Sequence, residues 1–366
     1  MSLWVVVGGQ FGSEGKGKIA AFIAQQEQMD ICIRCGGPNS GHSFVDRDGK
    51  TVVVRQLPTG FVNERTRLLI PAGALIDPLV LQGEIESLAL PSDRIGIDPN
   101  CFVIEERDRE TERTLGLRER LSSTLCGVGA AVARRVLRGP DARTAKDVSS
   151  ESPWLKGLIV KDGVSYEVNR ALDLGQRVLI EGTQGFGLSL FHSGYYPHCT
   201  SRDTTAAGFL SEVGVSPRLV TEIVVVLRTY PIRVAGKQAG PLDDITWEDI
   251  RKSSGYPREI EERTSVTNKV RRVGRFDWEL ARSAVRINRP SRIAINGLDY
   301  LDYANYGLRH VGSLSEKASS FVRDLEKDLA TPIRYLGVGP SLDHIIDCGA
   351  REEEARGQAS EVNLLR

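Results

Sequence analysis

The sequence predicts an α/β protein, a single large domain around a mostly parallel central sheet with helices on both faces. Short β-branched and apolar runs alternate along the chain with longer amphipathic segments, as in parallel α/β folds. Several of these runs are followed at once by glycine, as Val7 is by Gly8 and Glu181 by Gly182. Ligands bind at the carboxyl ends of strands in such folds, so this pattern also predicts a large ligand or several ligands.

The expected elements follow from these periodicities. Strands are expected at Trp4–Val7, Ile31–Arg34, Thr51–Arg55, Leu68–Ile70, Cys101–Ile104, Val178–Glu181, Ile223–Leu227 and Arg292–Asn296. Helices are expected at Lys16–Gln26, Pro78–Ser87, Val128–Arg138, Ala206–Glu212, Trp278–Ile287 and Ser315–Leu325. No linker or repeat divides the chain, so residues 1–366 are expected to form one domain, with an excursion at about 236–257 and an exposed tail at 349–366.

The composition argues against several classes of partner. The 366 residues include 48 Lys plus Arg and 48 Asp plus Glu, so no overall positive charge favours nucleic acid or an anionic membrane. No apolar run reaches the ~18–20 residues of a membrane helix, and the N-terminus lacks the pattern of a secretory leader. We therefore expect a cytoplasmic protein that binds anions only at local sites.

The cysteines are expected to be reduced and structural. Six cysteines in a chain of this length do not make a disulfide framework. Cys32 and Cys35 have the spacing of a redox pair or half a zinc site, but no second pair of ligands at matching spacing accompanies them. We therefore interpret them as two half-buried cysteines near a strand end.

A glycine-rich loop follows the first predicted strand and leads into the first predicted helix. It reads Gly8-Gly-Gln-Phe-Gly-Ser-Glu-Gly-Lys-Gly-Lys18. Convergent backbone N–H groups, a helix N-terminus and a lysine are the usual parts of a phosphate cradle. The spacing differs from a Walker A motif, because five residues separate Gly9 from Gly15 and Gly17 follows Lys16. A tight turn without a ligand is the alternative.

Three further segments carry polar side chains suited to nucleotide binding. His42 ends the loop Gly36-Gly-Pro-Asn-Ser-Gly-His42, where it could contact a phosphate or serve as a structural histidine. Glu181-Gly-Thr-Gln-Gly185 and Thr200-Ser-Arg-Asp-Thr-Thr205 are rich in amides and hydroxyls, which suit a polar base or a ribose phosphate. Residues 264–274 place three cations beside hydroxyls, as in a carboxylate site or a solvated basic face.

Taken in this order, the segments resemble the adenylosuccinate synthetase family, and most of all its shorter, archaeal-type members. The resemblance runs from Val5 to at least Asp347. It is carried by the glycine-rich loop, Asn39-Ser-Gly-His, Glu181-Gly-Thr-Gln-Gly and Arg271-Arg-Val-Gly-Arg-Phe-Asp277. Each motif alone is weak, whereas the ordered set is specific. The resemblance implies a ligase of purine biosynthesis in which GTP phosphorylates O6 of a 6-oxopurine nucleotide and the aspartate amine then displaces phosphate at C6.

By matching position, the resemblance also implies which residues hold each substrate. GTP with Mg²⁺ would lie against Gly12, Gly15, Lys16, Gly17, Gly41, His42, Ser43, Asn296, Asp299 and Gly339. The acceptor nucleotide would contact Ser13, Asn39, Thr124, Arg138, Gln184, Thr200 and Lys269, with Arg138 reaching across the interface of a homodimer. L-aspartate would be held by Thr267, Lys269 and Arg271, and Mg²⁺ by the Gly41 carbonyl and position 13. The catalytic set would be Ser13, Lys16, His42 and Gln184.

The motif around Asp299 bears on the choice of donor. Asn296-Gly-Leu-Asp299 stands where the family has Thr-Lys-Leu-Asp, whose carboxylate pairs with the guanine N1–H and 2-amino groups of GTP. Asp299 is kept while the lysine is replaced by Gly297, and the retained carboxylate favours GTP over ATP.

Ser13 is the main departure from the family pattern. The family has an aspartate there that binds Mg²⁺ and removes the N1 proton of IMP, and loss of a positioned base lowers a rate by ~10²–10⁴. A short neutral serine leaves room for a 2-amino group and could accept its hydrogen bond. The same substitution, with Trp247-Glu and Val266-Thr-Asn-Lys, resembles a phage-associated branch, a succinyl-2-aminoadenylate synthetase acting on dGMP. We therefore expect dGMP or GMP as the acceptor.

Three alternatives remain open. The chain could be an ordinary adenylosuccinate synthetase that uses IMP, or a relative that binds nucleotides without turnover. It could also be an unrelated NTPase whose loops match by chance, which would hydrolyse nucleotide without needing aspartate.

Overall fold

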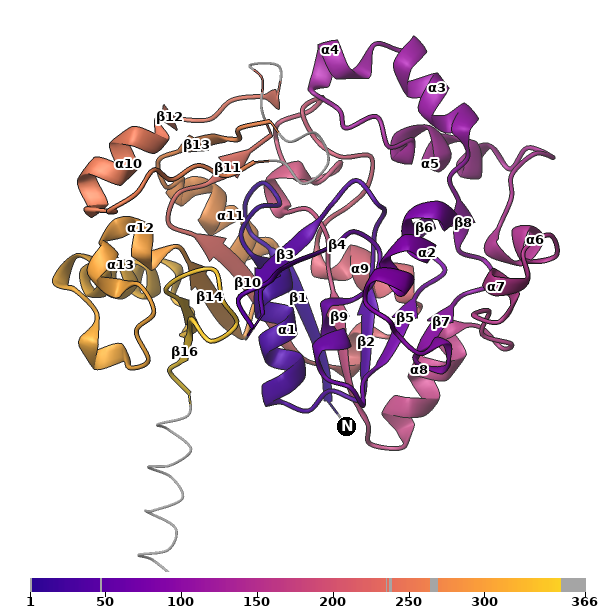
Figure 1. Cartoon of the computed structure of the whole chain (residues 1–366), viewed down its shortest axis with the longest axis horizontal. Helices are drawn as coiled ribbons and strands as arrows, with labels where there is room; N and C mark the ends of the chain where they lie inside the picture. Colours follow the sequence, from indigo (N-terminus) through magenta and orange to yellow (C-terminus); the bar gives the residue numbers. More distant parts are fainter. Residues whose placement is uncertain (1, 47, 235, 237–238, 264–268, 350–366) are drawn as a thin grey trace, which may run out of the picture.

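A nine-stranded sheet forms the centre of the described part of the protein (Figure 1). The structure is a computed structural model that describes residues 2–46, 48–234, 236, 239–263 and 269–349. The strand order is β16 (Ile345–Asp347), β15 (Ile333–Gly337), β14 (Arg292–Asn296), β10 (Val220–Arg228), β1 (Ser2–Gly8), β9 (Arg177–Glu181), β2 (Ile31–Arg34), β5 (Arg67–Ile70) and β7 (Ile95–Ile97). Every neighbouring pair is parallel except β15 and β16. The predicted α/β class is confirmed.

Smaller sheets and helices surround this centre. The outer strands are β3 (His42–Val45) with β4 (Thr51–Val54), β6 (Leu75–Ile76) with β8 (Phe102–Val103), and β11 (Ile232–Arg233), β13 (Arg272–Gly274) and β12 (Asp244–Ile245). The helices are α1 (Lys16–Gln26), α2 (Pro78–Ser87), α3 (Glu106–Thr114), α4 (Leu117–Leu121), α5 (Val128–Leu137), α6 (Ala145–Ser149), α7 (Pro153–Lys156), α8 (Val164–Asp173), α9 (Ala206–Val213), α10 (Trp247–Ser254), α11 (Trp278–Asn288), α12 (Leu298–Leu301) and α13 (Glu316–Leu329). Within the described residues, none of these helices has the length and apolar character needed to cross a membrane.

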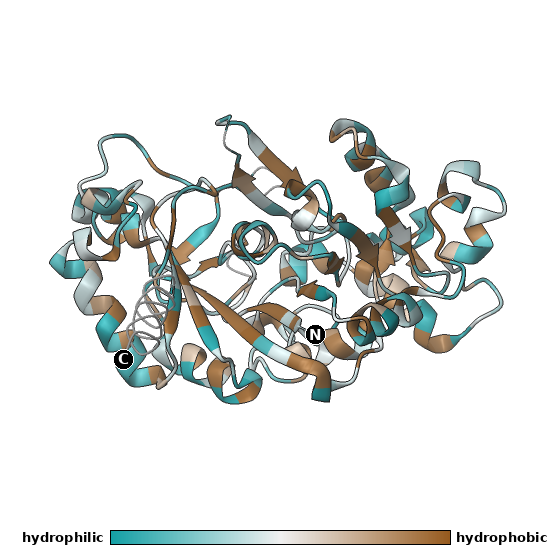
Figure 2. Ribbon diagram, turned by 90° about the horizontal axis from the view of Figure 1, so that it is seen from below, coloured by the Kyte–Doolittle hydropathy of each residue, from teal (hydrophilic) through white to brown (hydrophobic). Residues whose placement is uncertain are grey.

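Both faces of the sheet are buried, because side chains of a strand alternate between its two faces. On β1, Leu3, Val5 and Val7 point into a core shared with α8, α9, α11 and α13. Trp4 and Val6 point into the opposite core, which contains apolar side chains of α1 and α2. The sheet strands accordingly show as apolar ribbons between more polar helices (Figure 2).

The parallel arrangement brings the functional loops to one edge of the sheet. The carboxyl ends of β1, β2, β9, β10 and β14 lie at the same edge, and each is followed by a segment with a motif or a glycine turn. The loop after β1 turns directly into α1, so the glycine-rich motif stands at a helix N-terminus as predicted.

Several expected elements coincide with the structure, while others were missed. Helices α1 and α2 and strands β2 and β14 have the predicted bounds. Not predicted were the central strands β7, β15 and β16, the outer strands β3, β6, β11, β12 and β13, and the helices α3, α4, α6, α7, α8, α10 and α12. The segment 236–257 leaves the main sheet, but it contains β12 and α10, and Ile250 in it is buried.

Cys32 and Cys35 are more deeply buried than the sequence predicted. Cys32 and Cys35 are fully buried rather than half-buried, and all six cysteines are free thiols. Burial raises the pKa of both Cys32 and Cys35 well above the usual value of a thiol, so they are inert packing residues. Of the predicted tail, residues 350–366 lie outside the described residues.

We predict that Phe209→Ala destabilises the protein by about 3–5 kcal/mol, because a buried aromatic ring is removed from a close-packed core. Phe209 on α9 is fully buried, and a Cβ at Gly182 would lie 2.2 Å from its ring, so the ring fills the space beside the end of β9. Urea unfolding measures the change. Leu79→Ala is the matched control, because Leu79 is 82% exposed and its loss should change stability by under about 0.5 kcal/mol. Equal effects of the two variants would contradict the prediction.

Candidate active site

The glycine-rich loop is shaped by two close approaches. Gly15 caps α1 in a left-handed conformation with φ 86°, which glycine adopts without strain. A Cβ at Gly17 would lie 2.4 Å from the Cβ of His42, so only glycine lets the first turn of α1 pack against that histidine. The loop and His42 are thus fixed relative to each other.

A carboxylate and an ammonium group are buried together in this loop. Glu14 accepts hydrogen bonds from the backbone N–H groups of Gln10 at 2.9 Å and Gly12 at 2.8 Å, and from Lys16 Nζ at 2.7 Å. Both side chains are almost fully buried. Asn296, at the end of β14, donates from Nδ2 to the Glu14 carbonyl at 2.8 Å, so the loop is also tied to a second strand end. The loop therefore has its shape before any ligand arrives.

His42 is held by a buried ion pair between neighbouring strands. Arg34 Nη1 lies 2.9 Å from Glu181 Oε1 and 2.6 Å from His42 Nδ1, and His42 Nδ1 also contacts Glu181. Burial, together with the nearby Arg34, lowers the pKa of His42 to about 3, so the ring is neutral at pH 7. The other ring nitrogen, Nε2, is buried and has no hydrogen-bond partner among the described residues. Its position in a cavity leaves it available for a hydrogen bond to a bound group or to water.

A buried carboxylate lies farther along the same cleft. Asp299, which follows β14, is 4% exposed and accepts a hydrogen bond from Tyr256 Oη at 2.7 Å. Burial raises the pKa of Asp299 above its ordinary value, although the Tyr256 hydroxyl and Lys18 oppose this shift. Lys18 donates to the Gly339 carbonyl at 2.7 Å, and burial lowers its pKa to about 8.

One cavity of about 670 Å³ connects the glycine-rich loop with the Asp299 carboxylate. Because of its predicted ligand, the glycine-rich loop is called the phosphate loop from here on. The residues expected to bind GTP all line it: Gly12, Gly15, Lys16, Gly17, Gly41, His42, Ser43, Asn296, Asp299 and Gly339. Ser13 and Arg271 line the same cavity. Its length and its backbone N–H groups, cations and buried carboxylate suit a nucleoside triphosphate.

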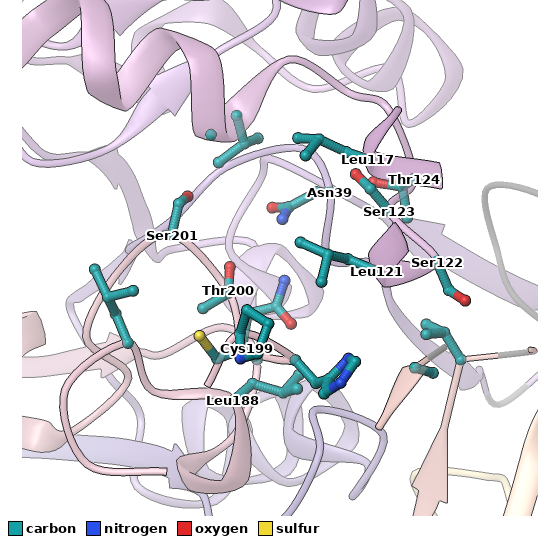
Figure 3. A pocket seen from close by; sticks show the side chains of 18 of the residues that line it. Asn39, Leu117, Leu121, Ser122, Ser123, Thr124, Leu188, Cys199, Thr200 and Ser201 are labelled. Atoms are coloured by element: carbon teal, nitrogen blue, oxygen red, sulfur yellow. The ribbon is translucent and has the colours of Figure 1, made fainter. Parts of the chain in front are cut away.

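A second cavity of about 360 Å³ lies on the other side of the phosphate loop. Four of the residues expected to bind the acceptor line it: Asn39, Thr124, Gln184 and Thr200. Figure 3 shows the side chains of Asn39, Thr124, Thr200 and the neighbouring serines 122, 123 and 201 gathered around this space. Hydroxyl and amide groups of this kind suit a phosphate or a ribose.

The two cavities meet at the phosphate loop. Phe11 lines the second cavity, and the next residues, Gly12 and Ser13, line the first. Gln184 has an unusual positive φ of 63° and lies against Gly12, where a Cβ would meet its Cα at 3.1 Å and its Oε1 at 3.4 Å. A group bound in the second cavity would therefore lie close to a group bound against the glycine-rich loop in the first cavity.

Two of the predicted site residues that the structure describes do not line either cavity. Arg138 is exposed at the end of α5, and Lys269 is exposed beside β13. Thr267 lies outside the described residues. Of the expected aspartate-binding residues, the structure describes Lys269 and Arg271, and Arg271 borders the donor cavity.

The contact at Ser13 differs from what a metal ligand requires. Arg271 Nη1 donates to Ser13 Oγ, and Arg228 Nη1 donates to the Ser13 carbonyl at 3.2 Å. The Arg271 guanidinium on this hydroxyl does not favour a divalent cation there, whereas Gly41 lines the donor cavity and a backbone carbonyl is a possible oxygen ligand. Among the described residues, no three His, Cys, Asp or Glu side chains are grouped so that they could hold a metal ion.

The chain matches the family described as adenylosuccinate synthetase over residues 5–156 and 144–307. The chain belongs to the adenylosuccinate synthetase family. It is a ligase of this family. The adenylosuccinate synthetase of Pyrococcus horikoshii is 42% identical over 348 residues, covering 94% of this chain and 97% of the relative. That of Methanocaldococcus jannaschii is 41% identical over 350 residues, covering 94% and 96%.

Two solved structures of similar proteins have the same fold. Fully ligated adenylosuccinate synthetase from Plasmodium falciparum superposes with a TM-score of 0.81 at 22% identity, covering 95% of this chain and all of the other. The succinoaminodeoxyadenylate synthetase of cyanophage S-2L, bound to dGMP and dATP as an energy donor, gives 0.77 at 27% identity, covering 94% and 95%. Identity to the phage enzyme is below that to the archaeal relatives, so the phage branch expected from the sequence is not supported over the archaeal type.

Sequence reasoning missed several residues that shape the adenylosuccinate synthetase site. Arg34 ends an apolar strand, and only the parallel register that places it opposite Glu181 reveals its role. Tyr256 follows α10, a helix that the sequence does signal, because Thr246 and Asp249 have the spacing of a capping box and form one. The pair of Arg228 and Glu262 joins the end of β10 to a segment beside Arg271, and nothing in the sequence indicates it.

We predict that Lys18 makes stability increase with pH in the range 8 to 10.5. Its pKa is about 8 in the folded protein and ~10.4 in an unfolded chain, so the unfolded chain binds more protons between these values. The free energy of unfolding of the wild type, relative to Lys18→Met, should therefore rise by about 3 kcal/mol across this range. Urea unfolding at a series of pH values measures the difference, with Lys327→Met on the exposed face of α13 as surface control. A difference independent of pH would contradict the prediction.

Proposed function

We propose that this protein joins L-aspartate to C6 of a 6-oxopurine nucleotide at the expense of GTP. The observation that carries the proposal is the pair of cavities that meet at Gly12 and Gln184. One cavity suits a nucleoside triphosphate, and the other suits a nucleoside monophosphate. The family assignment supports the same reaction. The acceptor O6 is first phosphorylated by the γ-phosphate, and the aspartate amine then displaces phosphate at C6, losing its proton.

The donor phosphates would occupy the cavity between the glycine-rich loop and His42. Lys16 and the N-terminus of α1 supply positive potential there, and Mg²⁺, held by the phosphates and the Gly41 carbonyl, would neutralise further charge. His42 Nε2 is buried without a hydrogen-bond partner among the described residues, and a phosphoryl oxygen would supply one. The negative charge of that oxygen would favour the protonated ring, so His42 could donate to it during transfer.

The acceptor would occupy the cavity lined by Asn39, Thr124, Gln184 and Thr200. Amide and hydroxyl groups can hold its phosphate and the edge of its base. Gln184, which lies against Gly12, is the residue best placed to bring O6 toward the donor loop. L-aspartate would bind at the mouth of the donor cavity, where the Arg271 guanidinium can pair with a carboxylate, with Thr267 and Lys269 as further contacts.

A homodimer is part of the proposal. Arg138 is exposed at the end of α5 beside Val136 and Leu137, which are 68% and 78% exposed. Two exposed apolar side chains beside an exposed arginine suit a protein–protein interface. At such an interface Arg138 would reach the acceptor phosphate bound by a second copy of the chain.

The acceptor base has two candidates, and different observations favour each. Relatives that are 41–42% identical over nearly the whole chain are adenylosuccinate synthetases, which favours IMP. Ser13 favours a guanine nucleotide, dGMP or GMP, because a serine hydroxyl cannot act as the base for N1 but can accept from a 2-amino group. The comparisons back IMP better, so IMP is the first candidate and guanylate the second.

We predict that phosphate release from GTP with Mg²⁺ requires both L-aspartate and a 6-oxopurine nucleotide. Parallel assays with IMP, GMP and dGMP decide the acceptor, and omission of aspartate is the control. Turnover with IMP alone would establish the first candidate, and turnover with GMP or dGMP alone the second. Release that does not need aspartate would indicate an NTPase, and no release with any acceptor a nucleotide-binding protein without turnover.

We predict that Ser13→Asp raises kcat with IMP by about 10²–10⁴, because it introduces a positioned base where a hydroxyl stands. Ser13→Ala is the matched control and should leave the rate with IMP nearly unchanged. The KM for aspartate is measured in both variants, because a carboxylate at position 13 would also pair with Arg271. If Ser13→Asp does not raise turnover of IMP, the missing base does not limit this reaction.

A further inference from the structure

A nearly buried ion pair lies next to the cavity proposed for the acceptor nucleotide, called the acceptor cavity below. Arg202 donates to Glu212, which is in the last turn of α9, and the two side chains are 11% and 15% exposed. Neither residue lines the donor or the acceptor cavity. Arg202 Nη1 and Glu212 Oε2 are buried without a hydrogen-bond partner among the described residues. A pair that is so little hydrated and only partly satisfied adds little stability, which favours a role in positioning.

Arg202 belongs to a loop that forms one wall of the acceptor cavity. The two residues before it, Thr200 and Ser201, line this cavity, and Figure 3 shows both among the side chains around the space. The backbone N–H of Leu190, which also lines the cavity, donates to the Arg202 carbonyl at 3.0 Å. The anchoring of the Arg202 side chain therefore bears on where the two hydroxyls lie.

Glu212 contacts a loop that forms a second wall of the acceptor cavity. The backbone N–H of Gly36 faces the Glu212 carboxylate, and Asn39, three residues farther along this loop, lines the cavity. The backbone of Glu212 is itself fixed, because its carbonyl accepts from the Gly73 N–H at 3.0 Å and a Cβ at Gly73 would lie 2.4 Å from the Glu212 Cβ. The carboxylate of Glu212 thus joins the two walls of the cavity.

We propose that the pair of Arg202 and Glu212 positions the two walls of the acceptor cavity, and that tight binding of a nucleoside monophosphate depends on it. This inference rests on the proposed function, because it takes the acceptor nucleotide to occupy this cavity. Both are positioning residues, since neither lines the cavity. Binding of the donor should depend on the pair far less, because His42 in the donor cavity is held separately by Arg34 and Glu181.

The charge of Glu212 changes near neutral pH. Burial raises the pKa of Glu212 to about 7, and Arg202 opposes this rise. Facing the carboxylate are also Asp203, whose charge raises the pKa further, and the thiols of Cys35 and Cys101, which burial keeps neutral. Above pH 7 the carboxylate is ionised and attracts Arg202, whereas below pH 7 the carboxyl group is neutral and the link between the walls weakens.

The test measures binding of IMP, GMP and dGMP, and separately of GDP with Mg²⁺, by isothermal titration calorimetry at pH 8. The proteins are the wild type and Glu212→Gln, which keeps the shape of the side chain and removes its charge. For the monophosphate that binds the wild type most tightly, we expect Kd to rise by about tenfold in Glu212→Gln, the value of one hydrogen bond to a charged group. The Kd of GDP should change by less than about twofold. Arg202→Lys keeps the charge and should stay within about threefold of the wild type.

Two further measurements separate positioning from a purely structural role. At pH 5.5 the wild type should bind the monophosphate no more tightly than Glu212→Gln, because Glu212 is then neutral in both the charged and the substituted chain's comparison, and the titration of the ligand phosphate affects both proteins alike. In urea at pH 8, Glu212→Gln should be at least as stable as the wild type. A carboxyl group whose pKa is higher in the folded protein than in the unfolded chain lowers stability as pH rises, and the amide removes this effect.

Glu167→Gln is the matched control. It removes the charge of a carboxylate that pairs with Arg67 at 2.9 Å, and neither of these residues lines the donor or the acceptor cavity, so both values of Kd should stay unchanged. Equal monophosphate binding by the wild type and Glu212→Gln at pH 8 would overturn the inference, as would a ratio that does not change at pH 5.5 or a wild type that binds no monophosphate. The proposed ligase is read from aspartate-dependent phosphate release, whereas this inference is read from binding, so the two can fail independently.

Discussion

The buried pair of Arg34 and Glu181 joins the carboxyl ends of β2 and β9, and the geometry of the site depends on it. The two residues are register partners on neighbouring parallel strands, and their charges are removed from water. Such a pair is favourable only when its remaining hydrogen bonds are satisfied. Here Glu181 accepts from the backbone N–H and hydroxyl of Thr59 at 2.7 and 2.9 Å, and Arg34 donates to the Ser40 carbonyl at 2.7 Å. The network fixes His42 and the loop before it in one arrangement.

A second set of buried charges fixes the phosphate loop from the other side. Glu14 binds the loop's own N–H groups and Lys16, and Asn296 ties the loop to β14. The loop lies where the two cavities meet, so under the proposed function its position would set the path of the phosphoryl group. Ser13 is the residue in this loop whose chemistry departs from the family, and its neighbours are guanidinium groups rather than a metal site. The fold of the family is thus kept, and Ser13 is the residue on which the proposed choice of acceptor depends.

Much of the site could be predicted from the sequence because its parts are local. The glycine-rich loop, the histidine loop and the segment at Asn296–Asp299 each follow a strand whose apolar run is plain in the sequence, and the family resemblance assigned them to one substrate. The ten residues expected at the donor do line one cavity. The short strands β11, β12 and β13 were missed, because their stability comes from packing and not from periodicity. Helix α10 was missed although its capping box can be read in the sequence.

The sequence by itself determined the fold class, the family and the identity of the loops that bear the chemistry, because apolar periodicity, glycine turns and ordered motifs are local properties of the chain. Only the tertiary structure decided which charges meet. Arg34 reaches Glu181 through strand register, Arg271 reaches Ser13 across 258 residues, and Tyr256 reaches Asp299 across 43 residues. These contacts depend on how distant elements pack, and a buried charge or hydroxyl takes its properties from the partner that packing supplies.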